Sequence, residues 1–285
     1  MSKSLAVLVA LLLCASFASA DVTEKFYVNR DTSVDQNDSD INMGLLYEET
    51  RGAKASWEED SSFFDWDVDP INDWIAGYGG VANVTGVKLY IKQNTDPWDP
   101  KAPGSDTGKG ICVFLLQSPD DWAEGDATDR WAAAPNWTDG TAAATYNYAQ
   151  CIYVGGVLDT VNSKAWSAGG GNIASIYNSS SPGRNSQDWT PGLGAMSEPE
   201  RYIPVDLDTA FWMALLDRMT NPDVHGVILW DYNDVGPNSN WWLSTREDPT
   251  GGGGPYLEIS IIPEPGMLGL LALGGLGLIR RRRTA

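Results

Sequence analysis

Hydrophobic and polar residues alternate with a period of two through much of the chain between residues 21 and 262, as in half-buried β-strands. The clearest alternating segments cover 87–92 (VKLYIK), 203–207 and 256–261. Two further segments, 111–116 (ICVFLL) and 226–230 (GVILW), are continuously apolar, which is typical of strands buried on both faces. Gly-Gly and Pro-Gly pairs separate these segments and predict turns.

One segment predicts a helix, because its apolar residues recur at every fourth position between a capping residue and a proline. In chain order these are Asp208 or Thr209, then Phe211, Leu215 and Met219, then Asn221-Pro222. Many short strands with one short helix predict an all-β fold. We therefore expect a single antiparallel β-sandwich or jelly roll over residues 21–262.

The first 20 residues have the pattern of a signal peptide. Lys3 gives the positive start, residues 5–13 are apolar, and Ala18 and Ala20 form a small-residue cleavage site. The apolar segment is far shorter than the roughly 20 residues of a transmembrane helix. Export with cleavage after Ala20 is the prediction.

The last 23 residues combine three features. A Pro-Glu-Pro triplet comes first, an apolar segment over 266–279 follows, and a cluster of arginines comes after it. The residues concerned are Pro263, Glu264, Pro265, Arg280, Arg281, Arg282 and Arg283. As a helix the apolar segment would span about 21 Å, less than the roughly 30 Å hydrocarbon core, so it predicts a short transmembrane helix. The arginines would keep its end on the cytoplasmic side.

This end of the chain resembles the PEP-CTERM sorting signal of Gram-negative bacteria, and all three parts of that signal are present. The resemblance implies an exported substrate of an exosortase-type processing protease, made by a bacterium that produces extracellular polysaccharide. It implies an intermediate held transiently in the inner membrane and then processed for the cell surface or extracellular matrix. An ordinary single-pass tail is the alternative.

Composition excludes several other function classes. The chain has 38 acidic and 19 basic residues, with a net charge of −19, so nucleic acid is not an expected partner. His225 is the only histidine, which excludes two-histidine mechanisms. The sequence has no nucleophile elbow and no phosphate-binding loop. We therefore expect a protein that is not an enzyme, although the many acids leave a polysaccharide lyase or hydrolase as an alternative.

The predicted mature chain contains two cysteines, Cys112 and Cys151. Two cysteines in an exported chain predict a disulfide bridge. The alternative is that both are buried thiols, since both lie in strand-like segments.

Several short motifs, in order, resemble the DNRLRE family of exported β-sandwich domains, which is related to carbohydrate-binding modules. They are Asp31-Thr32, Asn42-x-Gly44, FFDWDV (63–68), Trp122-x-Glu124, Thr145-Tyr146-Asn147, Trp166, Ser244-x-Arg246-Glu247 and Pro255-Tyr256-Leu257. The resemblance implies a β-sandwich over most of 26–262 and a relation to polysaccharide. This sequence departs from the family pattern at Tyr146 and by long insertions at 126–143 and 148–163.

The excess of tryptophan is the main candidate for ligand binding, since 13 are present. Aromatic rings stack on the apolar faces of sugars, with polar groups nearby to bind the hydroxyls. The candidates lie in loop-like stretches beside Asp or Asn: Trp98, Trp131, Trp137, Trp241 and Trp242. We interpret Trp66, Trp122, Trp166 and Trp230 as structural residues of the core.

An acidic loop is the candidate metal site. Asp35, Asp38 and Asp40 could bind calcium through their carboxylates. The spacing from Asp38 to Asn42 follows an EF-hand loop, but Met43 occupies the position of its glycine. The alternative is a solvated turn, in which Asp and Asn are common.

The leading hypothesis is thus an exported, non-catalytic surface or matrix protein that binds polysaccharide. A purely structural surface protein, with its tryptophans packed inside, is the alternative.

Overall fold

The computed structural model describes thirteen parts of the chain, and every structural statement below concerns these residues. They are 21–35, 42, 48–51, 60–92, 111–117, 119, 121–127, 135–166, 185–187, 202–231, 240–243, 246 and 253–263. The predicted signal peptide and residues 264–285 of the predicted sorting segment lie outside them.

Four antiparallel strands form the first sheet, sheet A, in the order β1-β15-β5-β12. They are β1 (Val22–Tyr27), β15 (Tyr256–Ile261), β5 (Val84–Lys92) and β12 (Tyr202–Leu207). Three of these strands contain the alternating segments of the sequence, which confirms that prediction. On β5, Val87, Leu89 and Ile91 are buried, because alternate residues of a strand face the same side.

Sheet B has the order β11-β6-β13-β4-β2. Its strands are β11 (Asn185–Gln187), β6 (Ile111–Gln117), β13 (Val224–Asp231), β4 (Asp60–Asp65) and β2 (Arg30–Asp35). The two continuously apolar segments are β6 and β13. Val113 and Leu115 of β6 pack into one core cluster and Phe114 and Leu116 into another, so burial on both faces is confirmed.

The described residues contain two α-helices, not the one predicted: α2 (Val68–Gly77) and α4 (Thr209–Leu216). Sequence analysis missed α2, although Val68, Ile71 and Ile75 are buried at helical spacing and the Asp67 side chain accepts from the Asp69 N–H. A short 3₁₀ helix, η1 (Val81–Asn83), follows α2. Neither α-helix in the described part is long and apolar enough to cross a membrane.

Helix α4 begins where the sequence predicts and ends earlier. The Asp208 side chain caps it by accepting from the Phe211 N–H at 2.8 Å. The helix stops at Leu216, so Met219 lies beyond it. The Asp217 carboxylate accepts from the Thr220 N–H at 3.1 Å, which closes a turn in place of the next helical turn.

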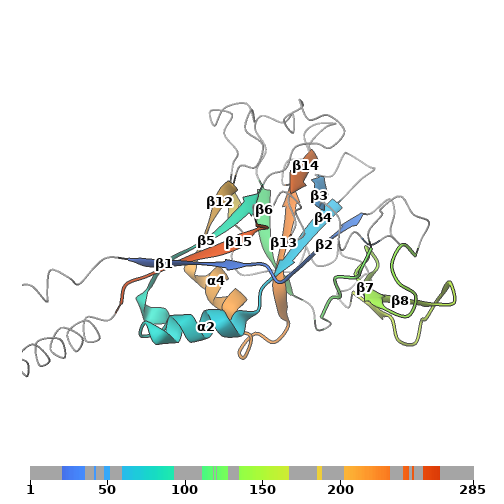
Figure 1. Ribbon diagram of the computed structural model, residues 1–285, viewed down its shortest axis with the longest axis horizontal. Coiled ribbons are helices and arrows are strands. Elements are labelled where there is room, and N and C mark those ends of the chain that lie inside the picture. Colours follow the sequence, from blue (N-terminus) through green and yellow to red (C-terminus); the bar gives the residue numbers. More distant parts are fainter. Residues whose placement is uncertain are drawn as a thin grey trace, which may run out of the picture.

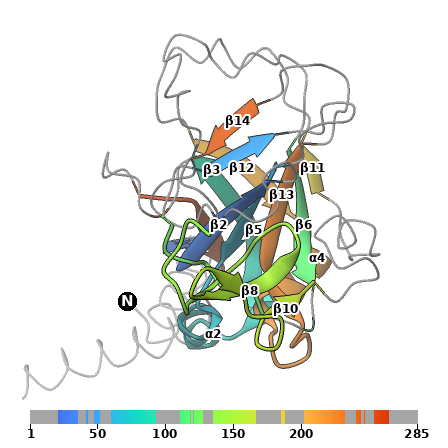
Figure 2. The ribbon, with the colours of Figure 1, turned by 90° about the vertical axis from the view of Figure 1, so that its right-hand side faces the viewer.

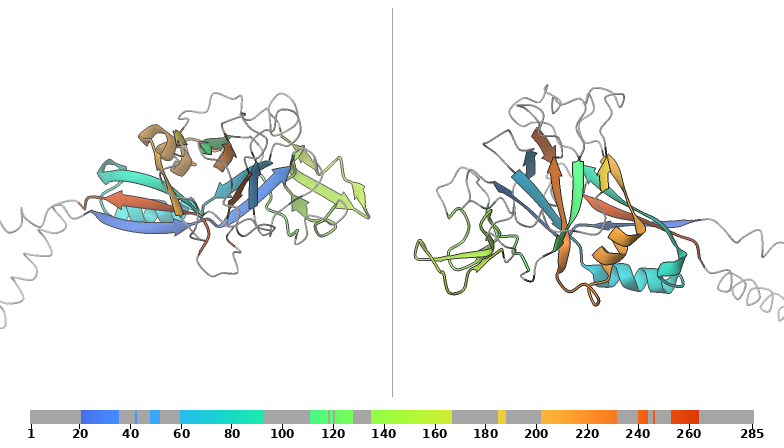
Figure 3. Two further views of the ribbon diagram at one scale, coloured as in Figure 1. Left: turned by 90° about the horizontal axis from the view of Figure 1, so that it is seen from above. Right: turned by 180° about the vertical axis from the view of Figure 1, so that it is seen from behind.

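One face of sheet A, one face of sheet B and both α-helices share a single hydrophobic core. Figure 1 shows α2 and α4 on one side of sheet A, with sheet B beside it. Seen from above, β5, β15 and β1 lie in front and α2 lies behind them (Figure 3). Sheet A therefore has an inner face toward the helices and an outer face away from them.

The other face of sheet B carries a second core built around Phe63, Trp122 and Trp166. The Phe63 ring lies edge-on to both indoles, at 5.7 Å from each centroid. A small sheet covers this side (Figure 2). It consists of β7 (Ala142–Ala143), β8 (Tyr148–Val154), β9 (Val157–Leu158) and β10 (Lys164–Ala165).

Three of the tryptophans assigned to the core are confirmed there, because Trp66, Trp122 and Trp166 are at most 3% exposed. The side chain of Trp230 lies outside the described set. A separate two-stranded ribbon pairs β14 (Asn240–Leu243) with β3 (Glu48–Arg51).

Candidate functional site

The outer face of sheet A carries a row of aromatic residues across its strands. Tyr27 of β1 pairs with Tyr256 of β15, which pairs with Tyr90 of β5. Tyr90 in turn pairs with Pro204 of β12. Strand register alone sets this row, because directly opposed residues project on the same side of a sheet. We call this surface, together with Tyr202 and the charged row described next, the tyrosine face.

The rings of the tyrosine face contact one another around Tyr256. The Tyr90 ring stacks on the Tyr256 ring, with centroids 4.7 Å apart and planes at 14°. The centroids of Tyr27 and Tyr202 lie 5.4 and 5.1 Å from that of Tyr256. Tyr256 is thereby only 4% exposed, whereas Tyr27 at the edge is 50% exposed. Tyr27 therefore offers solvent the largest ring surface of the row.

A charged row runs beside the aromatic one, two residues away from it on each strand. The register places Lys25 opposite Glu258, Glu258 opposite Lys88, and Lys88 opposite Asp206. Lys88 and Asp206 form an ion pair at 3.4 Å, and the Lys25 ammonium lies 4.5 Å from the Tyr256 centroid. The signs alternate along the row.

The Tyr90 hydroxyl links the two rows by donating to Glu258 Oε1 at 3.1 Å. Burial, and then this hydrogen bond, raise the pKa of Tyr90 above its usual 10.0. The hydroxyl therefore stays protonated and remains a donor at neutral pH. Exposed ring surface beside ammonium, carboxylate and hydroxyl groups combines the apolar and polar contacts that a sugar requires.

A cluster of charged residues lies where sheet B meets residues 121–127. The Asp65 carboxylate, only 5% exposed, accepts from Arg30 Nε and Nη2 at 3.0 and 2.6 Å and also from Arg218 Nη2. Arg30 also donates to the Trp122 carbonyl oxygen, and its guanidinium carbon lies 4.4 Å from the Trp122 ring centroid. Two arginines thus balance the buried carboxylate, and together they join β2, β4 and the turn that follows α4.

His225 belongs to the same cluster. Its Nδ1 lies 3.3 Å from Asp121 Oδ1, and its carbonyl accepts from Trp122 Nε1 at 2.8 Å. Burial lowers the pKa of His225, the positive charges of Arg218 and Arg30 lower it further, and Asp121 opposes them. These contacts are those of a structural histidine.

Several motifs from distant parts of the sequence meet next to this cluster. The Asp31 N–H donates to Glu124 Oε1 at 2.9 Å, and the Arg246 N–H donates to Asp31 Oδ2 at 2.6 Å. Arg246 and Glu124 also form an ion pair at 3.0 Å. The fully buried Asn42 donates from Nδ2 to Thr32 Oγ1 and to the carbonyls of Glu124 and Ala144. This junction fastens β2 to three separate loops.

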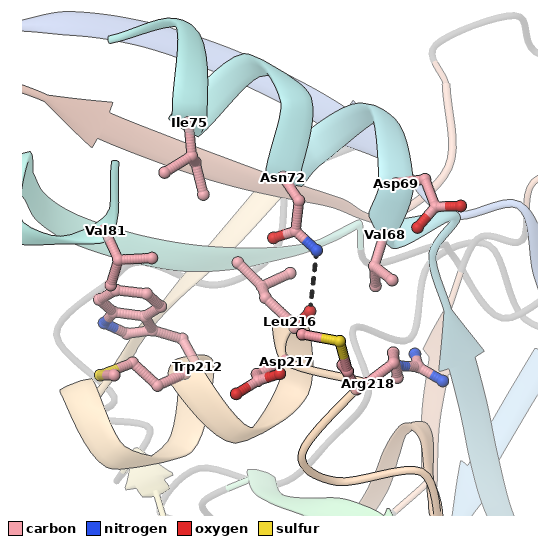
Figure 4. A pocket seen from close by; sticks show the side chains of 11 residues that line it. Val68, Asp69, Asn72, Ile75, Val81, Trp212, Leu216, Asp217 and Arg218 are labelled. Carbon is pink, nitrogen blue, oxygen red and sulfur yellow. Dashed lines mark hydrogen bonds between the residues drawn. The ribbon is translucent and has the colours of Figure 1, made fainter. Parts of the chain in front are cut away.

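A groove with a volume of about 320 Å³ lies between α2 and α4. Figure 4 shows Ile75, Val81, Trp212 and Leu216 along it, with Asn72 donating to the Leu216 carbonyl at 3.0 Å. Asp69, Asp217 and Arg218 add polar groups at its edges. The groove is thus mainly apolar, with charged groups of both signs at its margin.

The structure changes the list of candidate tryptophans. Trp137, predicted to contact sugar, is 6% exposed; its ring lies edge-on to Tyr153 at 5.6 Å, and its Nε1 donates to Thr141. That prediction is wrong in placing the ring in solvent, because Trp137 fills a small core with Ala127, Ala143 and Cys151. Trp241 and Trp242 occupy consecutive positions of β14. Their side chains, and the whole of Trp98 and Trp131, lie outside the described set.

Sequence reasoning missed the tyrosine face because it searched for tryptophan in loops. The alternation of residues could have revealed this face. Tyr90 and Tyr256 occupy the positions of two predicted strands that alternate with the apolar, buried ones, so the pattern places both on the outer side of the sheet.

The predicted calcium loop is described only at its ends. Asp35 is the last residue of β2, and Asp38 and Asp40 lie outside the described set. No group of three possible metal ligands occurs among the described His, Cys, Asp and Glu residues. Calcium binding through Asp35, Asp38 and Asp40 stays a prediction.

The disulfide likewise stays a prediction. Cys151 of β8 is fully buried beside Trp137, and Cys112 lies on β6 in sheet B with its side chain outside the described set.

Comparison with known proteins adds one finding. The protein-family model of the PEP-CTERM protein-sorting motif matches residues 262–283. The motif implies that the protein is exported, passes through a membrane-anchored intermediate and is processed by exosortase on its way to the cell surface. No curated protein matches the chain.

Proposed function

We propose that this protein is a non-catalytic, polysaccharide-binding protein of the cell surface or extracellular matrix, and that the tyrosine face is its binding surface. The observation that carries the proposal is the exposed Tyr27 ring beside a row of ammonium, carboxylate and hydroxyl groups on an outer sheet face. Export through the PEP-CTERM motif would place this face among extracellular polysaccharides.

We also propose that residues 21–262 form a β-sandwich of the DNRLRE type. Two antiparallel sheets sharing one core support this, as do the contacts between the motifs at Asp31, Asn42, Glu124 and Arg246. A non-catalytic role is supported by the ion pairs of Asp65 and Glu124 with arginines, because these contacts occupy carboxylate oxygens that a glycosidase would present to its substrate.

Affinity electrophoresis tests the binding surface, using gels that each contain one neutral or uronic-acid-rich polysaccharide, with and without calcium. We expect at least one polysaccharide to retard the protein and Tyr27→Ala to abolish most of that retardation. Tyr78→Ala is the matched control, because Tyr78 follows α2 and packs on Trp74 at 5.0 Å, away from the tyrosine face.

Two outcomes overturn the proposal. If no polysaccharide retards the protein, the purely structural alternative is favoured. Retardation that Tyr27→Ala leaves unchanged would place binding on another surface. Comparing Lys25→Ala and Lys88→Ala on acidic and neutral polysaccharides then tests what the charged row contributes.

A further inference from the structure

The chain leaves the described domain beside the groove between α2 and α4. The Ile262 N–H donates to the Asn83 carbonyl at 2.9 Å, and Asn83 ends the 3₁₀ helix that begins with Val81, a residue lining the groove. The apolar run of the sorting segment begins at Gly266, three residues after Pro263. Three extended residues span about 10 Å, so a membrane holding that run must lie close to this end of the domain.

Three exposed apolar side chains border the same groove. Val81 and Met213 are each 44% exposed, and Met219 is 94% exposed. Exposed apolar residues gathered around one groove are typical of a contact surface, whereas isolated ones are common on any protein. Asp69, Asp217 and Arg218 also line the groove. Because Arg218 is paired with Asp65, the two aspartates leave the groove with a net negative charge.

The groove and the tyrosine face lie on opposite sides of sheet A. Helices α2 and α4 pack against the inner face through residues such as Ile71 and Phe211, and the tyrosines project from the outer face. Figures 1 and 3 show α2 on one side of the sheet, and no helix of the described residues lies on the other side. A membrane in contact with the groove would leave the tyrosine face directed away from it.

We infer that, in the membrane-anchored intermediate, the groove between α2 and α4 rests on the bilayer surface with Val81, Met213 and Met219 among the lipid headgroups. The domain then presents its tyrosine face away from the bilayer. Because Asp69 and Asp217 repel anionic lipid, the contact favours a zwitterionic surface. This inference rests on the anchored intermediate and not on polysaccharide binding, so either can fail alone.

Methionine oxidation tests the contact in the wild-type chain. The mature protein with its sorting segment is placed in phosphatidylcholine nanodiscs, at most one chain per disc, and treated with chloramine-T, a charged, water-soluble oxidant. Mass spectrometry then compares sulfoxide formation at Met219 with that of a methionine peptide in the same tube. We expect Met219 to react several-fold more slowly than the peptide, and discs rich in phosphatidylglycerol to reduce this protection.

Equal rates for Met219 and the peptide in phosphatidylcholine discs would overturn the inference, since a residue 94% exposed to water should react freely. A second sample is prepared with two chains per disc, and protection that appears only in that sample would also overturn the inference, in favour of a contact between copies. The variant Met219→Glu should deprotect Met213, whereas Val157→Glu should not. Val157 is the matched control, being 68% exposed on the β8–β9 hairpin of the small sheet.

Discussion

Arg30 donates from both Nε and Nη2 to a single oxygen of Asp65, at 3.0 and 2.6 Å. The other carboxylate oxygen accepts from Arg218, so Asp65 joins two arginines that lie far apart in the sequence. Removing one partner of a buried ion pair leaves the remaining charges uncompensated, which costs more than the pair contributes when intact.

We therefore expect Asp65→Asn to lower the free energy of unfolding by about 3 kcal/mol, the lower end of the range for buried pairs, because both arginines are partly exposed. Denaturant unfolding measures the effect. The control is Asp206→Asn, which breaks the exposed pair with Lys88 and should change stability by less than about 1 kcal/mol. Equal effects of the two variants would contradict the structural role of Asp65.

Gly226 is the second test, because it lies in β13 with φ at +100° next to a register shift between Val224 and Val227. A Cβ here would overlap the Phe64 carbonyl oxygen and lie 3.0 Å from Asp65 Cα. We expect Gly226→Ala to destabilise the fold by about 3 kcal/mol or more. Thermal unfolding of Gly226→Ala is compared with that of Gly86→Ala. Gly86→Ala is the control, since a Cβ at Gly86 meets nothing within 4 Å.

Asn42 tests the junction between the separate motifs. Its amide nitrogen donates to three oxygens, those of Thr32, Glu124 and Ala144, at 3.3, 2.9 and 2.7 Å. Asn42→Asp keeps the shape and replaces this donor by an acceptor, so we expect a loss of about 3 kcal/mol or more in unfolding free energy. Asn72→Asp is the control, because Asn72 is exposed and donates only to the Leu216 carbonyl. If Asn42→Asp lowers the unfolding free energy no more than Asn72→Asp does, the role of Asn42 in holding the junction together is contradicted.

His225 predicts a pH dependence. Burial lowers its pKa below the usual 6.5, so the unfolded chain binds a proton in a pH range where the folded chain does not. This contribution to stability is complete above about pH 6.5 and is lost as the pH falls through the folded-state pKa. We expect His225→Gln to flatten the dependence of the unfolding free energy on pH between about 7 and 5.

Carboxylates titrate at a lower pH than His225 does, so the acid part of the stability profile serves as an internal reference for the His225→Gln comparison. A hydrogen bond from Thr138 lowers the pKa of Asp126 below 3.8, so its contribution is lost only in stronger acid. The acid limb of the profile should therefore be the same in wild type and His225→Gln. An unchanged slope between pH 7 and 5 in the variant would show that His225 does not titrate there.

Local patterns explain which parts of the fold were predictable. The period of two marked β5, β12 and β15, because burial of one sheet face requires it, and the apolar segments marked β6 and β13. Helix α2 was predictable from the helical spacing of Val68, Ile71 and Ile75 and from Asp67 as its cap. It was missed because the aspartates and the proline in the same segment are more typical of a loop. Trp137 was misjudged because flanking polar residues do not reveal whether a ring is buried.

The sequence by itself determined these five strands, the cap of α4 and the sorting motif, since each depends on residues adjacent in the chain. Only the tertiary structure decided which side chains meet. Asp65 lies 35 residues from Arg30 and 153 from Arg218, and no local pattern encodes that meeting. The row from Tyr27 through Tyr256 to Tyr90 likewise depends on the register of three strands, where a slip of one residue would turn each ring to the opposite face.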